Sequence, residues 1–413
     1  TGNKKVVGPV TLKGKDTIDL QKGEDGNLYI ISSLGDFRIV ADQAVPVNEI
    51  VNPLSQPTLP DGSTFGFADA GDQIYRELKI TAPVGNSRVF ELDYKVSGSD
   101  VFYLHEGADG CIYGSSILPL HLFRYDRKKA QLVDLGRCSS ATGEAYSMAN
   151  LGRNLYISSY PAAKVSVYDP NRPYHFGDQP ESNPQDLGRM DDISYRPRST
   201  LAGPLGRVWL ASLPDYGRWG GPLTYYDPQT GNRKAYYQIC GDASCYTLAH
   251  LEKMQLIAVG TSIFGGSGTR PKVDQAVLFL WNYQAEKKIW EGTLDRPVSV
   301  FNALLTGFDG RLYGTVHGGS QPAEIFVFDP EVREFTDLLS IPNGRPLDLG
   351  LQNGPDGKIY GFTTSCVYRL DPNSLAIEEL IVEEDGFSIA GPIVGQDIYF
   401  AKGHRLRAAQ IFE

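Results

Sequence analysis

Histidine is the side chain that most readily takes or gives a proton near neutral pH, and this chain of 413 residues contains six. His105, in the segment LHEGADG, is the first catalytic candidate because it falls on a short predicted strand facing the centre of a repeated fold. The matching positions of other repeats hold Met148, Leu201, His250, Leu305 and Gln352. A buried histidine bonded to a neighbouring repeat is the alternative interpretation of His105.

Two more histidines and one tyrosine fall in loops that follow the second strand of a repeat. His121 lies in SSILPLHLF, Tyr160 in ISSYPAAK and His317 in TVHGGSQ. Loops of this kind gather at one end of a rigid scaffold, where binding and catalytic residues are commonly found. We therefore expect all three at the functional end, although most of the 23 tyrosines must serve in packing.

The loop LPDYGRWGGP (213–222) is the longest of these loops in the well-formed repeats and contains Tyr216, Arg218 and Trp219. A guanidinium binds a carboxylate through two parallel hydrogen bonds, while the aromatic rings would cover the face of a sugar. Arg198, in SYRPRST, would approach from the same end and add a second positive charge. This combination predicts a site for a sugar acid; a loop folded back on its own surface is the alternative.

Sequence patterns for metal, phosphate and serine-nucleophile chemistry are missing from the chain. It contains no calcium-loop pattern, HExxH, CxxC, GxxxxGK[ST] or G-x-S-x-G motif. Asp191 and Asp192 are the one notable carboxylate pair, and they are better placed to cap a loop than to act across a glycosidic bond. We expect neither a metal ion nor an organic cofactor in the site.

These residues are positioned by a repeat whose clearest copy is DGCIYGSSILPLHLFRYD, residues 109–126. Its Asp-Gly pair marks a tight turn before a short strand. The copies are anchored on Tyr113, Tyr156, Trp209, Ala258, Tyr313, Tyr360 and Tyr399, at spacings of 43, 53, 49, 55, 47 and 39 residues. A period of this length is typical of the four-stranded blade of a β-propeller.

The repeats predict an all-β chain that forms a seven-bladed β-propeller. We expect a single domain over 1–413, with regular blades over 99–413 and an irregular N-terminal segment over 1–98. The last repeat is too short for a whole blade, so N-terminal strands are expected to complete it and close the ring. Eight blades are the alternative, with 23–43 as the additional one, and 72–96 read as two alternating strands.

Composition and charge narrow the choice of partners. A formal net charge of -10 and a pI near 5.2 argue against nucleic acid, and no apolar run is long enough to span a bilayer. The start TGNKKVV is typical of a processed N-terminus, so we expect a secreted monomer, although a trimmed chain would look the same. Cys240 and Cys245, in ICGDASCY, are predicted to form a small disulfide, with two separate thiols as the alternative.

The repeat cycle DGxIYxGS, LFxYDP and DLGR has its most distinctive copy in YDPNRPYHFGDQPESNPQDLGR, and it resembles the secreted β-propeller polysaccharide lyases. These include ulvan lyases and L-rhamnose-α-1,4-D-glucuronate lyases, and the similarity covers roughly residues 99–413. It implies β-elimination at a uronic acid, which leaves an unsaturated uronate. The resemblance implies His105, His121 and Tyr160 as proton-transfer groups and Arg218 as the cation that neutralises the carboxylate, with Arg198 as its competitor.

In such a lyase, Arg198, Tyr216, Trp219 and His317 would bind the acidic polysaccharide or oligosaccharide without a cofactor. Two alternatives from other classes remain open. A non-catalytic carbohydrate-binding or interaction propeller would use the same end of the ring, because a fold does not fix a function. A propeller glycoside hydrolase would need paired carboxylates at that end.

Overall fold

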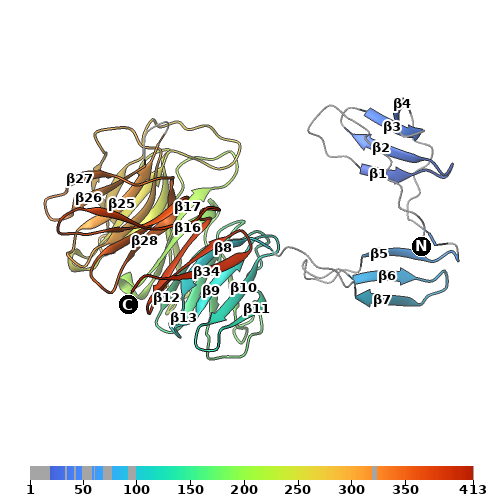
Figure 1. Cartoon of the computed structure of the whole chain (residues 1–413), viewed down its shortest axis with the longest axis horizontal. Coiled ribbons are helices and arrows are strands. Elements are labelled where there is room, and N and C mark those ends of the chain that lie inside the picture. Colours follow the sequence, from blue (N-terminus) through green and yellow to red (C-terminus); the bar gives the residue numbers. More distant parts are fainter. Residues whose placement is uncertain are drawn as a thin grey trace. The chain divides into compact units, whose positions relative to one another are not determined.

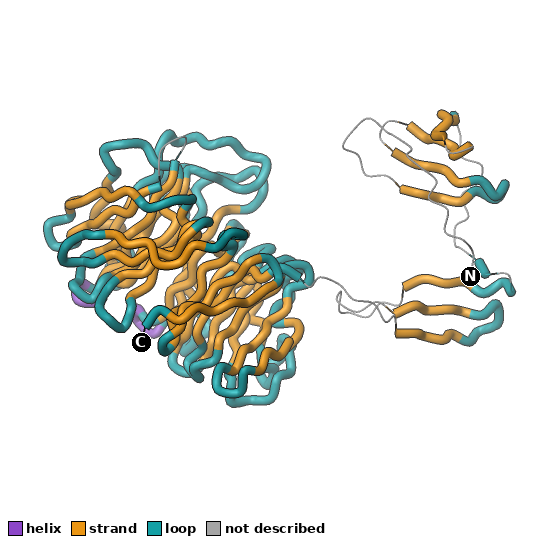
Figure 2. The backbone as a smooth tube through the Cα atoms, viewed as in Figure 1, coloured by secondary structure: helices purple, strands orange, loops and turns teal. Residues whose placement is uncertain are grey.

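The computed structural model describes residues 19–32, 35–40, 43–48, 58–59, 61–67, 77–91, 99–318 and 323–412. The chain forms two compact units, Thr1–Lys95 and Val96–Glu413, where the sequence predicted a single domain. In the described ranges the regular structure is almost entirely strand, with two short 3-10 helices at Pro204–Gly206 and Glu252–Met254. Figure 2 shows this distribution, which confirms the all-β prediction.

The first unit contains two antiparallel sheets, each with its strands in chain order. One consists of β1 (Asp19–Lys22), β2 (Leu28–Ser32), β3 (Gly35–Val40) and β4 (Gln43–Val47), and the other of β5 (Thr64–Phe67), β6 (Glu77–Thr81) and β7 (Ser87–Glu91). The first sheet contains the copy at 23–43, and β6 and β7 are the two strands predicted within 72–96. The sequence predicted that N-terminal strands complete the last blade, but the described strands of the first unit pair only with one another. The start TGNKKVV lies outside the described ranges.

The described strands of the second unit fall into successive antiparallel groups, numbered here 1 to 7 in chain order. Groups 1 to 3 are β8 (Val101–Glu106), β9 (Ile112–Ser116), β10 (His121–Asp126) and β11 (Gln131–Arg137); β12 (Ala145–Leu151), β13 (Asn154–Ser159), β14 (Lys164–Tyr168) and β15 (Gln185–Arg189); and β16 (Ser194–Ala202), β17 (Val208–Pro214), β18 (Leu223–Tyr226) and β19 (Arg233–Tyr236).

Groups 4 to 7 continue the same plan. They are β20 (Ser244–Leu251), β21 (Leu256–Ser262), β22 (Leu278–Asn282) and β23 (Lys287–Gly292); β24 (Val300–Thr306), β25 (Leu312–His317), β26 (Glu324–Asp329) and β27 (Glu334–Ser340); β28 (Pro346–Asn353), β29 (Ile359–Thr363), β30 (Cys366–Leu370) and β31 (Ile377–Val382); and β32 (Ile389–Val394), β33 (Asp397–Lys402) and β34 (Arg405–Gln410). Groups 4 and 5 share one sheet through the single pair Ser262–Val300.

The first strand of each group lies innermost and contacts the first strand of the next (Figure 1). The cycle runs through β8, β12, β16, β20, β24, β28 and β32, and β32 in turn contacts β8. A backbone hydrogen bond of 2.9 Å from Val101 N to Gly403 O joins the last group to the first. Such a closed ring of radial antiparallel sheets is a β-propeller, as the sequence predicted.

The Asp-Gly turn explains why an aspartate, a glycine and a tyrosine recur at fixed spacing in the repeat. The carboxylate of Asp109 accepts hydrogen bonds from the backbone N–H of Cys111 (3.1 Å) and the hydroxyl of Tyr113 (2.8 Å), while Gly110 adopts a φ of 74°. The same tyrosine hydroxyl bond recurs in the pairs Tyr29–Asp25, Tyr313–Asp309 and Tyr360–Asp356. One aspartate thus fixes the turn and also satisfies the polar end of a tyrosine whose ring is buried in the core.

Strand register corrects two of the positions matched to His105. His105 pairs with Tyr113, whereas Ala149 pairs with Tyr156 and Ala249 with Ala258. The residues equivalent to His105 in groups 2 and 4 are therefore alanines. Met148 and His250 are displaced by one position, which places their side chains on the opposite face of the strand.

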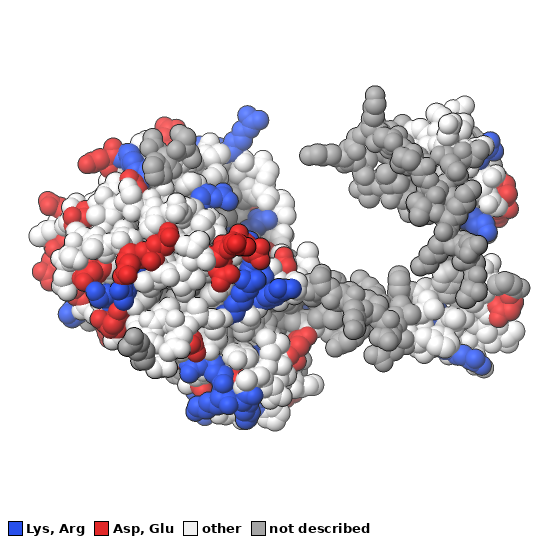
Figure 3. Space-filling model, in the orientation of Figure 1, with Lys and Arg blue, Asp and Glu red and all other residues white. Residues whose placement is uncertain are grey.

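Two broader features of the described residues bear on the choice of partners. No helix among them has the length and apolar character needed to cross a membrane. Figure 3 shows acidic and basic side chains interspersed over the visible face of the second unit rather than segregated by sign.

Candidate functional site

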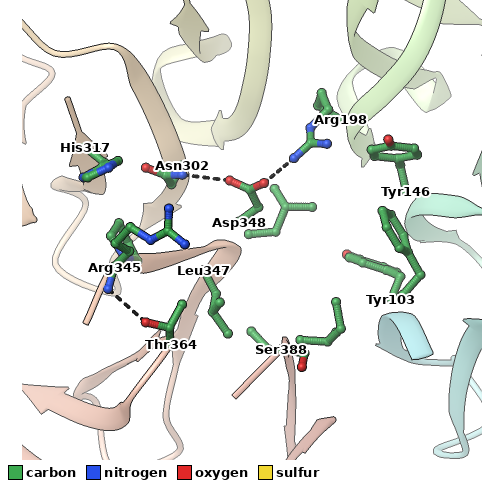
Figure 4. Close-up of a pocket in the computed structure, with 15 residues that line it drawn as sticks. Tyr103, Tyr146, Arg198, Asn302, His317, Arg345, Leu347, Asp348, Thr364 and Ser388 are labelled. Atoms are coloured by element: carbon green, nitrogen blue, oxygen red, sulfur yellow. Dashed lines mark hydrogen bonds and ion pairs between the residues drawn. The ribbon is translucent and has the colours of Figure 1, made fainter. Parts of the chain in front are cut away.

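A cavity of about 340 Å³ opens at the end of the ring where the inner strands begin (Figure 4). Groups 1, 2, 3, 5, 6 and 7 all contribute side chains to its wall. Arg345 and His317 lie on one side, Tyr103 and Tyr146 lie on the other, and Asp348 lies between Asn302 and Arg198. A concave site that collects a few polar groups from several elements of a rigid scaffold is the usual form of a ligand pocket.

A bulge in β28 brings Asp348 into this cavity. Pro346 pairs with Thr363, yet the next pair in the ladder is Leu351 with Gly361, so the intervening residues leave the register of the strand. Leu349 has a φ of 54°, in the left-handed region that is unfavourable for a branched side chain. Backbone strain of this kind is often found at functional sites, where the surrounding structure holds it in place.

The carboxylate of Asp348 is held by residues from three other strand groups. It accepts hydrogen bonds from Asn302 Nδ2 (2.8 Å) and from the Tyr246 hydroxyl (3.0 Å), and it forms an ion pair with Arg198. Burial raises the pKa of Tyr246 far above its usual range, so this phenol remains a donor at neutral pH. The guanidinium of Arg198 also lies 4.8 Å from the ring centre of Tyr146 and 4.6 Å from that of Tyr246.

Arg345 differs from Arg198 because no described carboxylate lies within ion-pair distance of its guanidinium. Its backbone N–H donates to Thr364 Oγ1 (3.1 Å), which anchors the residue, while its side chain is exposed to the cavity. A solvent-facing cation without an internal counter-ion is suited to meet an anionic ligand.

His317 stands beside Arg345 at the end of β25. Burial, followed by the positive charges of Arg345 and Arg296, lowers the pKa of His317 below its ordinary value. The imidazole is therefore neutral at pH 7, and its buried Nδ1 has no hydrogen-bond partner among the described residues. On the other side of the cavity, burial raises the pKa of Tyr103 to about 12, so its phenol stays protonated.

The structure brings together only some of the residues that the sequence singled out. Arg198 and His317 line the cavity, but the charge of Arg198 is neutralised by Asp348. Tyr160 lies next to the cavity, with its ring 6.1 Å from that of Tyr146, and its hydroxyl is 3.3 Å from that of Tyr216.

Arg218 and Trp219 line a separate hollow, together with Lys272 from the neighbouring loop. Trp219 Nε1 donates to Arg270 O (2.8 Å), and Lys272 Nζ lies 3.5 Å from the centre of the indole. Arg218 is thus absent from the cavity wall, and the pairing of Arg218 with His105 in one site is not found.

His121 lies on β10, the third strand outward in group 1. Its buried Nδ1 is 3.0 Å from both carboxylate oxygens of Asp134 on β11. This histidine joins two outer strands and does not line the cavity.

His105 also lies outside the cavity, where its ring is stacked with that of Tyr103 and the two ring centres are 6.5 Å apart. Its Nε2 is buried without a hydrogen-bond partner among the described residues, and burial lowers the pKa of His105 to about 4, an effect that the nearby side chain of Asn150 partly offsets. The alternative interpretation was a buried histidine bonded to a neighbouring repeat. The imidazole is enclosed as that interpretation expects, but no described hydrogen bond joins it to a neighbouring repeat.

The buried His105 makes the stability of the second unit depend on pH. The pKa of His105 in the folded state lies below the unfolded value near 6.5. The stabilisation that the folded state gains from the neutral imidazole is therefore fully present above pH 6.5 and is lost as the pH falls toward 4. We expect the wild type to lose about 2 kcal/mol more than His105→Gln between pH 7 and pH 5. Urea unfolding measures this difference; equal losses in the two proteins would show that His105 is not buried as a neutral ring.

The sequence missed Asp348, Arg345, Asn302 and Tyr246. Arg198 lies on the inner strand of group 3, and the segment GRPLDLG (344–350) holds Arg345 and Asp348 at the start of the inner strand of group 6. The position of a charged residue at the start of an inner strand is therefore a signal that the sequence does contain for Arg345 and Asp348. Asn302 and Tyr246 carry no comparable signal, because their importance comes from contact with Asp348.

The cysteines contribute neither a disulfide nor a metal site in the described part of the chain. All five are free, so the predicted Cys240–Cys245 bridge is wrong, and Cys240 Sγ instead lies 3.7 Å from Lys288 Nζ and 3.4 Å from a carboxylate oxygen of Glu291. No group of three or more His, Cys, Asp or Glu side chains is placed to hold a metal ion within the described ranges.

The fold and its central cavity place the chain among the β-propeller proteins. No protein-family model matches the chain, and no curated protein matches it. Among solved structures it is similar to Kuenenia stuttgartiensis hydrazine synthase, with a TM-score of 0.59 and 12% identity over 77% of this chain and 97% of that one.

Two other solved structures are also similar. The β-propeller domain of Myceliophteria thermophila Cps50 (Swd1) has a TM-score of 0.54 and 10% identity over 78% of this chain and all of that one. The extracellular domain of a putative one-component system from B. thetaiotaomicron has a TM-score of 0.52 and 11% identity over 96% of this chain and 52% of that one. At these identities the similarity concerns the fold alone.

Proposed function

We propose that the cavity binds the carboxylate of an acidic sugar, with Arg345 as the cation that meets it. The observation that carries the proposal is the contrast between two arginines in one cavity. Arg198 is neutralised by Asp348, whereas Arg345 faces the opening without a described counter-ion. A planar guanidinium favours a carboxylate because it donates two parallel hydrogen bonds.

The rest of the wall suits a sugar ring. Phe102, Tyr103 and Tyr146 supply aromatic surface, and Phe102 packs edge-on against Tyr146 with ring centres 4.8 Å apart. Asn302, Thr364 and Ser388 add polar groups that match sugar hydroxyls. A volume of about 340 Å³ is at the lower end of the range of small-molecule pockets.

A second candidate function, β-elimination at the bound uronate, is favoured by the protonation states of His317 and Tyr103. The neutral imidazole of His317 would remove the C5 proton after Arg345 has neutralised the carboxylate. The electrons of the C5–H bond would form the C4–C5 double bond as the C4–O bond breaks. Tyr103, still protonated, would give its proton to the leaving oxygen, so no external reagent is required.

Titration calorimetry with galacturonic acid and galactose tests the binding proposal. We expect the acid to bind, more weakly as salt rises, and galactose to bind at least tenfold more weakly, because only the acid can pair with Arg345. Equal affinity for both sugars would overturn the proposal.

Ultraviolet absorbance with uronate-containing polysaccharides tests the elimination. If the chain is a lyase, the wild type forms unsaturated uronate and His317→Gln loses that activity while it still binds the acid. Binding without absorbance leaves recognition as the function, and reducing sugar released without absorbance indicates hydrolysis.

A further inference from the structure

A row of aromatic rings leads from the cavity to the surface. Ring-centre distances are 6.1 Å from Tyr146 to Tyr160, 5.4 Å from Tyr160 to Tyr195 and 5.2 Å from Tyr195 to Tyr216, and the last two pairs are nearly perpendicular. The first ring lines the cavity, and Tyr216 at the other end is 53% exposed. Aromatic surface therefore continues from Tyr146 in the cavity wall to Tyr216 outside it, where the hydroxyls of Tyr160 and Tyr216 are 3.3 Å apart.

Arg196 lies at the centre of this row. Its guanidinium carbon is 4.7 Å from the ring centre of Tyr160, 5.8 Å from that of Tyr216 and 5.9 Å from that of Tyr195. Three rings around one guanidinium hold it by cation–π contacts and do not neutralise its charge.

Two carboxylates belong to segments near Arg196, and neither forms a described ion pair with it. Glu144 is buried, which raises its pKa, and Tyr146 together with the charges of Arg196 and Arg198 partly offsets this rise. Asp215 lies 3.6 Å from Arg189. Within residues 99–318 and 323–412, no carboxylate forms an ion pair with Arg196. Arg196 and its tyrosines thus resemble the cavity, because both places combine aromatic surface with an arginine that has no described ion pair.

We propose that Arg196, Tyr160, Tyr195 and Tyr216 form a second site that binds a further acidic unit of an extended saccharide chain. This inference rests on the proposed function of the cavity and specifies its ligand as a chain that carries more than one carboxylate. One unit would occupy the cavity at Arg345, and the chain would leave past Tyr146 and lie across the tyrosines.

Two sites that engage one chain predict a dependence of affinity on chain length, because the second contact is made at high effective concentration. A single sugar acid would fill only the cavity and gain nothing from Arg196. A chain long enough to reach Tyr216 would bind more tightly than the monomer, by more than the statistical gain from repeated units.

Calorimetry with oligogalacturonates of one, two, four and six residues, each residue carrying a carboxylate, tests the inference. In the wild type we expect affinity for the hexamer to exceed that for the monomer by at least 30-fold. Arg196→Gln and Tyr216→Ala should each reduce hexamer affinity about tenfold and leave monomer affinity unchanged. Phe308→Ala, which removes an exposed ring from a turn at the other end of the inner strands, should change neither affinity.

The possible results separate this inference from the proposal on which it rests. If monomer and hexamer bind the wild type equally well, or if both variants keep the full length dependence, the second site is overturned while the cavity proposal stands. If neither galacturonate binds the wild type, both are overturned. Because Tyr216 is exposed, its alanine variant tests the site even if Arg196→Gln fails to fold.

Discussion

Arg345→Gln is expected to lower the affinity of the second unit for galacturonic acid by about 100-fold, with little change in stability. The side chain is exposed to the cavity, and glutamine keeps much of its length, so the fold loses no described ion pair. The ligand loses both the charge and the paired N–H groups that a carboxylate requires, which is worth about 3 kcal/mol. Calorimetry at low and at physiological salt measures the change.

Arg345→Lys and Arg405→Gln provide matched controls for this variant. Lysine retains the charge without the planar fork, so we expect an intermediate loss of about tenfold. Arg405 is exposed on β34, and its removal changes the net charge equally without altering the cavity. A similar loss in Arg405→Gln would mean that overall charge, rather than Arg345, determines binding.

The pKa of His317 gives a second readout for Arg345→Gln that needs no ligand. The positive charge of Arg345 is one of the causes that lower this pKa, so removing it should raise the pKa of His317. Titration of the imidazole signals by NMR would detect the shift. An unchanged pKa would show that the two side chains are farther apart than the cavity requires.

Asp348→Ala is expected to destabilise the second unit by about 3 kcal/mol. The variant leaves the mostly buried guanidinium of Arg198 without its counter-ion, and it also leaves the Tyr246 hydroxyl and the Asn302 amide without an acceptor. The effect is smaller than for a fully buried pair because the Asp348 side chain is 37% exposed.

Urea unfolding followed by tryptophan fluorescence measures this loss in the full chain. All four tryptophans belong to the second unit, so the signal reports on the propeller alone. Asp274→Asn, at an exposed carboxylate, is the control and should have no measurable effect. Adding Arg198→Met to Asp348→Ala should restore part of the stability, because no unpaired charge then remains; a further loss in the double variant would contradict this account.

The parts of the fold that were predictable depend on contacts local in sequence. The Asp-Gly turn and the tyrosine four residues after the aspartate form one bonded unit, so each copy identifies a group wherever it occurs. The period between copies then predicted the propeller. The same pattern of an Asp-Gly turn and a tyrosine occurs at Asp25 and Tyr29, in a sheet of the first unit. This local pattern therefore cannot show whether a strand belongs to the ring.

The site was less predictable because its geometry depends on distant residues. His105 and His121 are chemically suitable, yet neighbouring strands bury one and pair the other with Asp134. Asp348 reaches the cavity only through a bulge in β28, and nothing in the composition of GRPLDLG specifies that the ladder is interrupted there. Because the bulge places Asp348 against Arg198, it neutralises the charge of Arg198 and leaves Arg345 without a described counter-ion.

The hydrogen bond from Val101 N to Gly403 O joins positions separated by about 300 residues of chain. Closing so long a loop carries a large entropic cost that only the complete set of inner strands can offset, so folding of this unit should be slow. During synthesis the ring remains an open arc until the final strands leave the ribosome, with strand edges exposed at both ends. The interval before closure is therefore when the nascent chain is most exposed to aggregation.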